Sequence, residues 1–190
     1  MKRFAYLKER KKVLAMEELI ALALEAGFSH AGALGSGALE FLPEVRQMCA
    51  ADRCHSYGKT WCCPPGCGTL EEIAARAAAY GGGVLVQSTA ALEDDFDVEA
   101  MLATEALHKR RFAAFTARVR ERCPDCLPMG AGGCTLCGAC TYPDAPCRYP
   151  DRAWPSMEAY GLLVSRVCEK SGLGYYYGPR TLTYTSCVLV

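Results

Sequence analysis

The residues of this chain that are best suited to chemistry are its cysteines, and four of them fall within one short segment. Cys134, Cys137 and Cys140 recur with two residues between them, and Cys147 follows directly after Pro146. Gaps this short allow a single tight loop to direct several sulfur atoms at one point. Four thiolates that converge in this way are the ligand set of a tetrahedral metal ion or of an iron–sulfur cluster.

A second set of four cysteines lies nearer the N-terminus, with gaps of four, eight and three residues. Its members are Cys49, Cys54, Cys63 and Cys67. Cys54 and Cys63 are the strongest candidates, and the conformationally restricted Pro64-Pro65 pair follows Cys63 directly. We expect this set to bind metal as well. His55 is an alternative ligand, since histidine replaces a thiolate in some clusters.

The spacing of the later set favours an iron–sulfur cluster over zinc. Structural zinc sites usually take a C-x2-C pair from one turn and a second pair from a distant segment. The run C-x2-C-x2-C, with a further cysteine beside a proline, is typical of ferredoxin-type loops. In this chain the proline precedes the last cysteine, and the last gap is longer than in that motif. We predict one or two [4Fe–4S] clusters, with zinc as the alternative, above all for the earlier set.

Five cysteines remain outside the two sets: Cys62, Cys123, Cys126, Cys168 and Cys187. Cys62 is the weaker member of an adjacent pair, since neighbouring side chains of an extended backbone point in opposite directions. Cys123 and Cys126 follow the C-terminal end of a predicted helix, which does not activate thiols, so we interpret them as incidental or as reserve ligands. Cys168 and Cys187 stand in apolar patterns and are expected to be small buried residues.

The overall composition limits the kinds of partner. The chain has 190 residues, 51% of them hydrophobic, which is enough for one domain with its own core. Lys and Arg number 21, as do Asp and Glu, so the basic excess that is usual in nucleic-acid-binding proteins is missing. We therefore expect no nucleic-acid partner.

The count of thirteen cysteines also indicates in which cellular compartment the protein is expected. A disulfide framework would require a secreted protein. Residues 13–27 form an apolar run that contains Glu17, Glu18 and Glu25, which the core of a signal peptide would not tolerate. No apolar run is long enough to cross a membrane, which takes about 18 residues. We expect a cytoplasmic protein without membrane contact, whose clustered thiols serve metal or redox chemistry.

The elements that must position these thiols form a single predicted domain over residues 1–190. Apolar periodicity and capping signals predict helices over 13–26, 69–80, 97–122 and 157–171. Strands are predicted over 28–34, 84–86, 175–177 and 182–190. The expected fold is α+β or α/β, a small and mostly four-stranded sheet with about four helices. Two cysteine-rich metal-binding loops lie at about 43–70 and 123–155. His108 is expected on the solvated basic face of the longest helix.

Four stretches carry a resemblance to a known family, namely residues 49–54, 57–72, 130–150 and 155–161. They resemble small cysteine-rich proteins labelled "predicted metal-binding protein", a domain of unknown function that is common in anaerobic bacteria and archaea. The resemblance implies binding of a metal or an iron–sulfur cluster and names no substrate. The cysteines that fit the family's pattern are Cys54, Cys63, Cys134, Cys137, Cys140 and Cys147. By the same likeness, Cys62, Cys123 and Cys126 are peculiar to this member.

Three functions fit these features. The first is an iron–sulfur electron carrier or accessory protein that passes single electrons to a redox partner protein. The second is an enzyme in which one cluster keeps an open iron for substrate, if the earlier set offers only three thiols. The third is a zinc-stabilised interaction module. We expect the first, because few other chemical motifs accompany the thiols.

Overall fold

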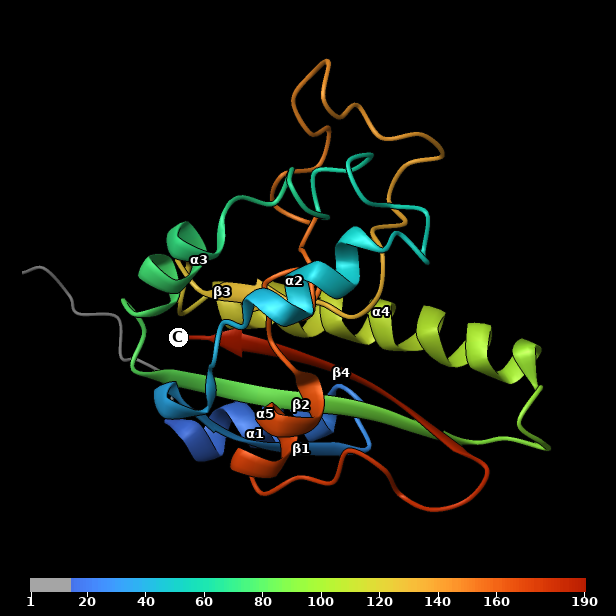
Figure 1. The fold of residues 1–190 in the computed structure, drawn as a ribbon. Coiled ribbons are helices and arrows are strands. Elements are labelled where there is room, and N and C mark those ends of the chain that lie inside the picture. Colours follow the sequence, from blue (N-terminus) through green and yellow to red (C-terminus); the bar gives the residue numbers. More distant parts are fainter. Residues whose placement is uncertain (1–14) are drawn as a thin grey trace, which may run out of the picture.

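The computed structural model describes residues 15–190, which form an α+β fold (Figure 1). The helices are α1 (Met16–Glu25), the short 3-10 helix η1 (Ser36–Ala38), α2 (Pro43–Ala50), α3 (Leu70–Ala77), α4 (Val98–Arg120) and α5 (Val164–Lys170). The strands are β1 (His30–Gly35), β2 (Gly82–Ala91), β3 (Leu127–Met129) and β4 (Thr181–Leu189). The predicted fold class is thereby confirmed, with five α-helices and a four-stranded antiparallel sheet in the described part. Residues 1–14, which hold the start of the helix predicted over 13–26, lie outside the description.

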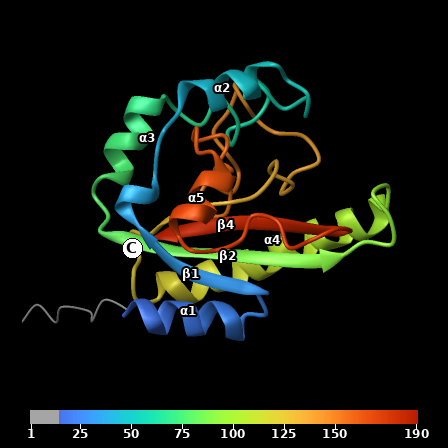
Figure 2. The same cartoon turned by 60° about the horizontal axis from the view of Figure 1, so that its bottom comes forward.

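The sheet lies between two layers (Figure 2). Its order is β1-β2-β4-β3, all antiparallel, and Val84 of β2 pairs with Val188 of β4 at the centre. Val84 and Val86 face α1 and α4, whereas Leu85 faces the opposite side, as the alternation of a strand requires. Both faces are therefore buried, which explains why the strand predicted over 84–86 is apolar at every position.

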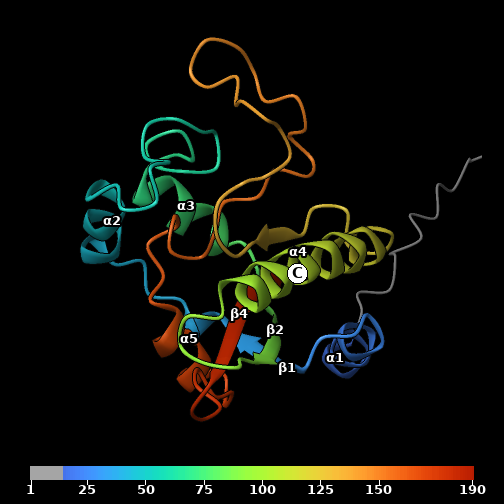
Figure 3. The same cartoon turned by 90° about the vertical axis from the view of Figure 1, so that its right-hand side faces the viewer.

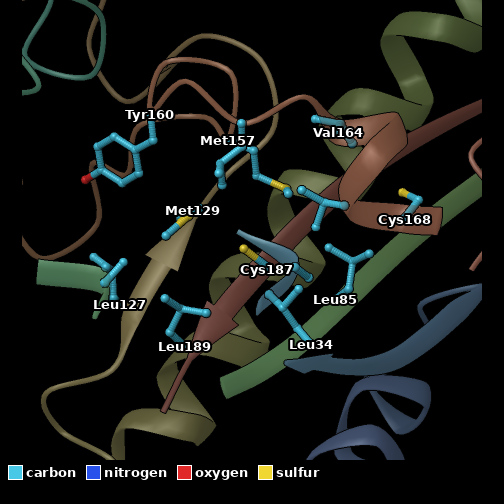
Figure 4. Close-up of a cluster of buried hydrophobic side chains, with 14 of the residues drawn as sticks. Leu34, Leu85, Leu127, Met129, Met157, Tyr160, Val164, Cys168, Cys187 and Leu189 are labelled. Atoms are coloured by element: carbon cyan, nitrogen blue, oxygen red, sulfur yellow. The ribbon is translucent and has the colours of Figure 1, made fainter. Parts of the chain in front are cut away.

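Two hydrophobic clusters fill the spaces on either side of the sheet. The α4 cluster consists of Leu19, Ala23, Phe28, Val84, Val86, Phe112, Phe115, Val119, Cys126 and Val188. The loop-side cluster lies on the face toward the cysteine-rich loops, and Figure 4 shows Leu34, Leu85, Met129, Met157 and Cys187 within it. Cys168 and Cys187 are fully buried in this second cluster. The prediction that these two thiols act as small apolar residues is confirmed.

Local signals set the starts of two predicted helices. The Thr69 hydroxyl accepts a hydrogen bond from the Glu72 amide, and the Glu72 carboxylate accepts one from the Thr69 amide, so a capping box opens α3 at the start of the helix predicted over 69–80. Asp97 caps α4 by accepting a hydrogen bond from the Ala100 amide at 3.0 Å. Within residues 15–190, no helix combines the length and apolarity that crossing a bilayer would require.

Two predictions near the C-terminus are wrong. The helix predicted over 157–171 begins only at Val164, because Gly161 adopts a left-handed φ of 80° and interrupts it. A Cβ at Gly161 would lie 2.6 Å from Leu70 Cδ2, so the Leu70 side chain would have to shift, but it is the left-handed φ that favours glycine here. The strand predicted over 175–177 is an irregular bend instead. There Tyr177 donates a hydrogen bond to the Gln87 carboxamide at 2.7 Å.

Two short elements lie within the segments that were predicted as loops. Helix α2 occupies the start of the predicted loop 43–70, and Pro43 stands at its N-terminus, a position that proline favours. Strand β3 lies in the predicted loop 123–155 and pairs with the end of β4, with Leu127 opposite Leu189. Pro128 is tolerated there because β3 is an edge strand. The cysteine-rich loops are consequently shorter than predicted.

His108 lies inside the protein rather than on the solvated face of α4, so this prediction is wrong. Its side chain is 1% exposed, and its Nδ1 and Nε2 lie 3.0 Å and 2.8 Å from the hydroxyls of Ser88 and Ser186. Burial lowers the pKa of His108 to about 3, and the positive charges of Arg111 and Lys109 act in the same direction. The imidazole is therefore neutral at ordinary pH, and it joins α4 to β2 and β4.

The buried His108 should make folding pH-dependent. Because its pKa falls from 6.5 to about 3 on folding, its stabilising effect is complete above pH 6.5 and is lost as the pH falls toward 3. In metal-free protein, His108→Gln should reduce the slope of the free energy of unfolding against pH, between pH 6.5 and 3, by up to about 1.4 kcal/mol per pH unit. Urea unfolding at a series of pH values measures it, with the exposed His55→Gln as control. An unchanged slope in His108→Gln would contradict the assignment.

Candidate metal centre

The two cysteine-rich loops, residues 51–69 and 130–156, lie side by side beyond the loop-side face of the sheet (Figure 3). Neither residues 51–69 nor residues 131–150 contain a helix or a strand. Contacts between side chain and backbone join the loops. The indole of Trp61 donates a hydrogen bond to the Ala145 carbonyl at 3.0 Å and packs edge-on against Tyr142, with the ring centroids 4.9 Å apart. Segments some 80 residues apart in the chain are thus held as one unit.

Five thiols from both loops line a cavity of about 170 Å³, which we call the outer pocket. They are Cys62, Cys134, Cys137, Cys140 and Cys147. The cavity has room for a group of several atoms, since one water molecule needs roughly 10–15 Å³ by the same measure. The structure therefore brings together the whole later set of predicted ligands, and adds Cys62 from the other loop.

Cys62 and Cys134 interact directly in the outer pocket. A hydrogen bond from the Cys62 thiol to the Cys134 sulfur lowers the pKa of Cys134 to about 6, with help from the Leu136 amide and the charge of Lys109. The same hydrogen bond, together with burial, raises the pKa of Cys62 far above its usual value. Within this pair, the proton is therefore favoured on Cys62 and the negative charge on Cys134. Thiolates are the form in which cysteines bind metal.

A second cavity of about 420 Å³, the inner pocket, is lined by the four thiols of Cys49, Cys54, Cys63 and Cys134. Glu105, Lys109 and Glu158 also contribute to its wall. Burial is the main reason that the pKa values of Cys49 and Cys63 are raised. Both thiols are thus protonated in the metal-free protein, and metal binding would release their protons. Three of the four predicted ligands of the earlier set are brought together here.

Cys67, the remaining predicted ligand, lines neither pocket. An Arg46 guanidinium nitrogen donates a hydrogen bond to the Cys67 sulfur at 3.2 Å, and that sulfur lies 3.5 Å from the Ala159 carbonyl oxygen. Arg46 also donates to the carbonyls of Ala159 and Gly68. Burial raises the pKa of Cys67, although Arg46 opposes that shift. Cys67 packs against the loop-side cluster and joins the base of its loop to α2.

Lys109 of α4 contacts the later cysteine-rich loop, although the basic half of this helix was predicted as a solvated face. Its ammonium group donates hydrogen bonds to the Gly133 carbonyl at 2.7 Å and to the Glu105 carboxylate at 2.6 Å. The residue before Cys134 is thereby tied to a rigid helix. Spacing alone did not reveal this contact, because it depends on how α4 lies beneath the loop.

All thirteen cysteines are free thiols, so none of the predicted ligands is consumed by a disulfide. Within residues 15–190, no three His, Cys, Asp or Glu side chains already converge closely enough to hold one metal ion. The thiols are spread over the walls of the two pockets instead. An all-sulfur donor set of this kind suits zinc or an iron–sulfur cluster, and a cluster binds each thiolate at a different iron atom. The donor set therefore fits the predicted cofactor.

The other candidate thiols lie elsewhere. Cys126 is buried in the α4 cluster, and Cys123 packs against the same cluster. Burial raises the pKa of Cys126, which leaves it a poor nucleophile. Neither residue lines the outer or the inner pocket.

Comparison with known proteins agrees with this donor set. Neither the curated proteins nor the solved structures include a significant match to the chain. A family model described as "Predicted metal-binding protein (DUF2284)" matches residues 14–190, which is almost the whole chain. The protein therefore belongs to the DUF2284 family of predicted metal-binding proteins.

Proposed function

We propose that this protein is an iron–sulfur protein that binds [4Fe–4S] clusters between its two cysteine-rich loops and passes single electrons to a redox partner protein. The observation that carries the proposal is the convergence of eight thiols on two adjacent pockets: Cys49, Cys54, Cys62, Cys63, Cys134, Cys137, Cys140 and Cys147. Two clusters with four thiolate ligands each require eight thiols.

The arrangement of the sulfur atoms supports clusters rather than single zinc ions. A zinc ion draws four ligands to one centre at about 2.3 Å from each sulfur. The thiols of this chain instead line cavities large enough for a group of several atoms. The run C-x2-C-x2-C in the outer pocket agrees with this assignment.

The position of the pockets supports electron transfer. Cys54 and Cys140 are exposed, so each pocket reaches the surface at one of its thiols. A cluster at such a place could exchange electrons with a docked protein. The aromatic rings of Trp61 and Tyr149 line the outer pocket and would shield a cluster from water, which tunes its potential.

Purification without oxygen tests the proposal. The protein should be brown and should contain about eight iron and eight acid-labile sulfide per chain if both clusters are present. Reduction with dithionite should produce the electron paramagnetic resonance signal of reduced [4Fe–4S] clusters. Cys137→Ser should lose about half of the iron and sulfide, because one of the two clusters loses a ligand, whereas Cys168→Ala, a change in the hydrophobic core, should keep all of both. A colourless protein, or one that contains zinc without sulfide, would overturn the proposal.

A further inference from the structure

The two sets of cysteines do not remain separate in the folded protein. Cys62 belongs to the earlier loop but lines the outer pocket with Cys137, Cys140 and Cys147. Cys134 belongs to the later loop but also lines the inner pocket, beside Cys54 and Cys63. The outer pocket is therefore bordered by one cysteine of the earlier set of segments and four of the later loop, and the inner pocket by three of the earlier and one of the later. Cys134 is the single thiol that borders both pockets.

We propose that the two sites exchange one ligand each, so that every cluster is held by both loops. The outer cluster would be bound by Cys62, Cys137, Cys140 and Cys147. The inner cluster would be bound by Cys49, Cys54, Cys63 and Cys134. This proposal rests on the proposed iron–sulfur function and assigns the ligands within it. It adds Cys62 to the eight cysteines chosen from spacing and removes Cys67.

The adjacent residues Cys62 and Cys63 provide the first argument. Cys62 faces the outer pocket and Cys63 faces the inner one, so their side chains diverge from neighbouring backbone positions. Cys62 is 4% exposed, yet it belongs to neither hydrophobic cluster. Cys62 lies instead among the other thiols that line the outer pocket, and it interacts with Cys134. A ligand role accounts for a thiol buried among thiols, whereas core packing does not.

Cys67 provides the second argument, because other contacts already occupy its sulfur. It receives a hydrogen bond from Arg46 and lies close to the Ala159 carbonyl. Moving this sulfur to the inner pocket would break a contact with a guanidinium that also holds the carbonyls of Ala159 and Gly68. Without Cys67, eight thiols border the pockets, and the inner pocket has only three of them besides the shared Cys134. Assigning Cys134 to the inner site therefore leaves four thiols for each cluster.

The exchange has a consequence for electron flow. The peptide bond between Cys62 and Cys63 would link the two clusters directly. Crossed ligation also occurs in two-cluster ferredoxins, where the fourth cysteine of one run binds the other cluster. With four thiolates each, neither cluster would keep an open iron. The structure thereby favours a carrier of electrons over an enzyme that binds substrate at iron.

Two serine variants, Cys62→Ser and Cys67→Ser, separate the exchange from the ligand sets chosen from spacing, in which Cys67 is a ligand and Cys62 is not. After purification without oxygen, Cys62→Ser should retain about half of the iron and sulfide of the parent, because one of two clusters loses a ligand. Cys67→Ser should retain all of it. Spin quantification of the reduced proteins should show the same pattern, and Cys168→Ala should match the parent.

The opposite pattern, with a cluster lost in Cys67→Ser or with both clusters retained in Cys62→Ser, would overturn the exchange. Circular dichroism shows whether each variant folds. If Cys62→Ser does not fold, Cys67→Ser decides between the two ligand assignments. Two full clusters in Cys67→Ser would require Cys62 as the eighth thiolate, whereas loss of a cluster would contradict the proposal. A parent protein without sulfide would instead disprove the proposed function, and that result is obtained before any variant is compared.

Discussion

Removal of the metal from the protein is expected to release the two cysteine-rich loops while the sheet remains folded. Residues 51–69 and 131–150 contain no helix or strand, so their order depends on a few turns and side-chain contacts. Metal binding contributes on the order of 10 kcal/mol in small thiolate sites, and this free energy is unavailable to the metal-free chain. The loops should therefore lose most of their stability.

The sheet should survive because its core is built from other residues. The α4 cluster is formed by α1, α4 and the central strands, and none of its buried members belongs to either cysteine-rich loop. Val84, Phe115 and Val188 all belong to this cluster, so their packing should not depend on metal bound by the thiols. The loss of order should thus be local, as expected for segments with few buried apolar contacts.

Hydrogen–deuterium exchange, read by mass spectrometry before and after treatment with an oxidant and a chelator, measures this effect. Peptides from residues 51–69 and 131–150 should exchange much faster in the metal-free protein, and peptides from β2 and α4 should not change. Far-UV circular dichroism should retain most of its signal. Equal protection of the loops in both forms would show that their own contacts suffice, which contradicts the prediction.

Among single alanine substitutions of buried residues, Phe115→Ala is expected to cause the largest decrease in the free energy of unfolding. Phe115 is 0% exposed, and its ring packs edge-on against Phe28 with the centroids 5.9 Å apart. Truncating a buried phenylalanine usually costs about 3–5 kcal/mol, because apolar contacts are lost and a cavity remains. Helix α4 should then pack less firmly against the sheet and hold Lys109 and the loop above it less well.

Urea unfolding of the metal-free protein measures this loss without interference from the clusters. Phe96→Ala is the matched control, because Phe96 precedes the same helix and is 87% exposed. Its effect should stay within about 0.5 kcal/mol, as for most surface substitutions. Equal midpoints for the two variants would mean that Phe115 is not part of the core that supports α4.

Much of the fold could be predicted because the relevant signals are local. The capping residue Thr69 marked the start of α3, an acidic stretch ending at Asp97 marked the start of α4, and apolar patterns located β2 and β4. The break at Gly161 could not be predicted in the same way, since it depends on the approach of this turn to Leu70. The burial of His108 was missed for a similar reason, because its partners Ser88 and Ser186 lie on distant strands.

The sequence by itself determined that this is a cysteine-rich chain with a metal-binding pattern, because short gaps between thiols limit how far apart one loop can place them. It also indicated a mixed fold of helices and a small sheet, through periodicity and caps that act over a few residues, and the antiparallel pairing of the strands in the structure made the class α+β. Only the tertiary structure decided which thiols share a pocket. Cys62 meets Cys134 across more than 70 residues of chain, and Arg46 holds Cys67 away from both pockets. Such contacts depend on how two loops are folded over one sheet, so they cannot be predicted from the spacing of cysteines within one loop.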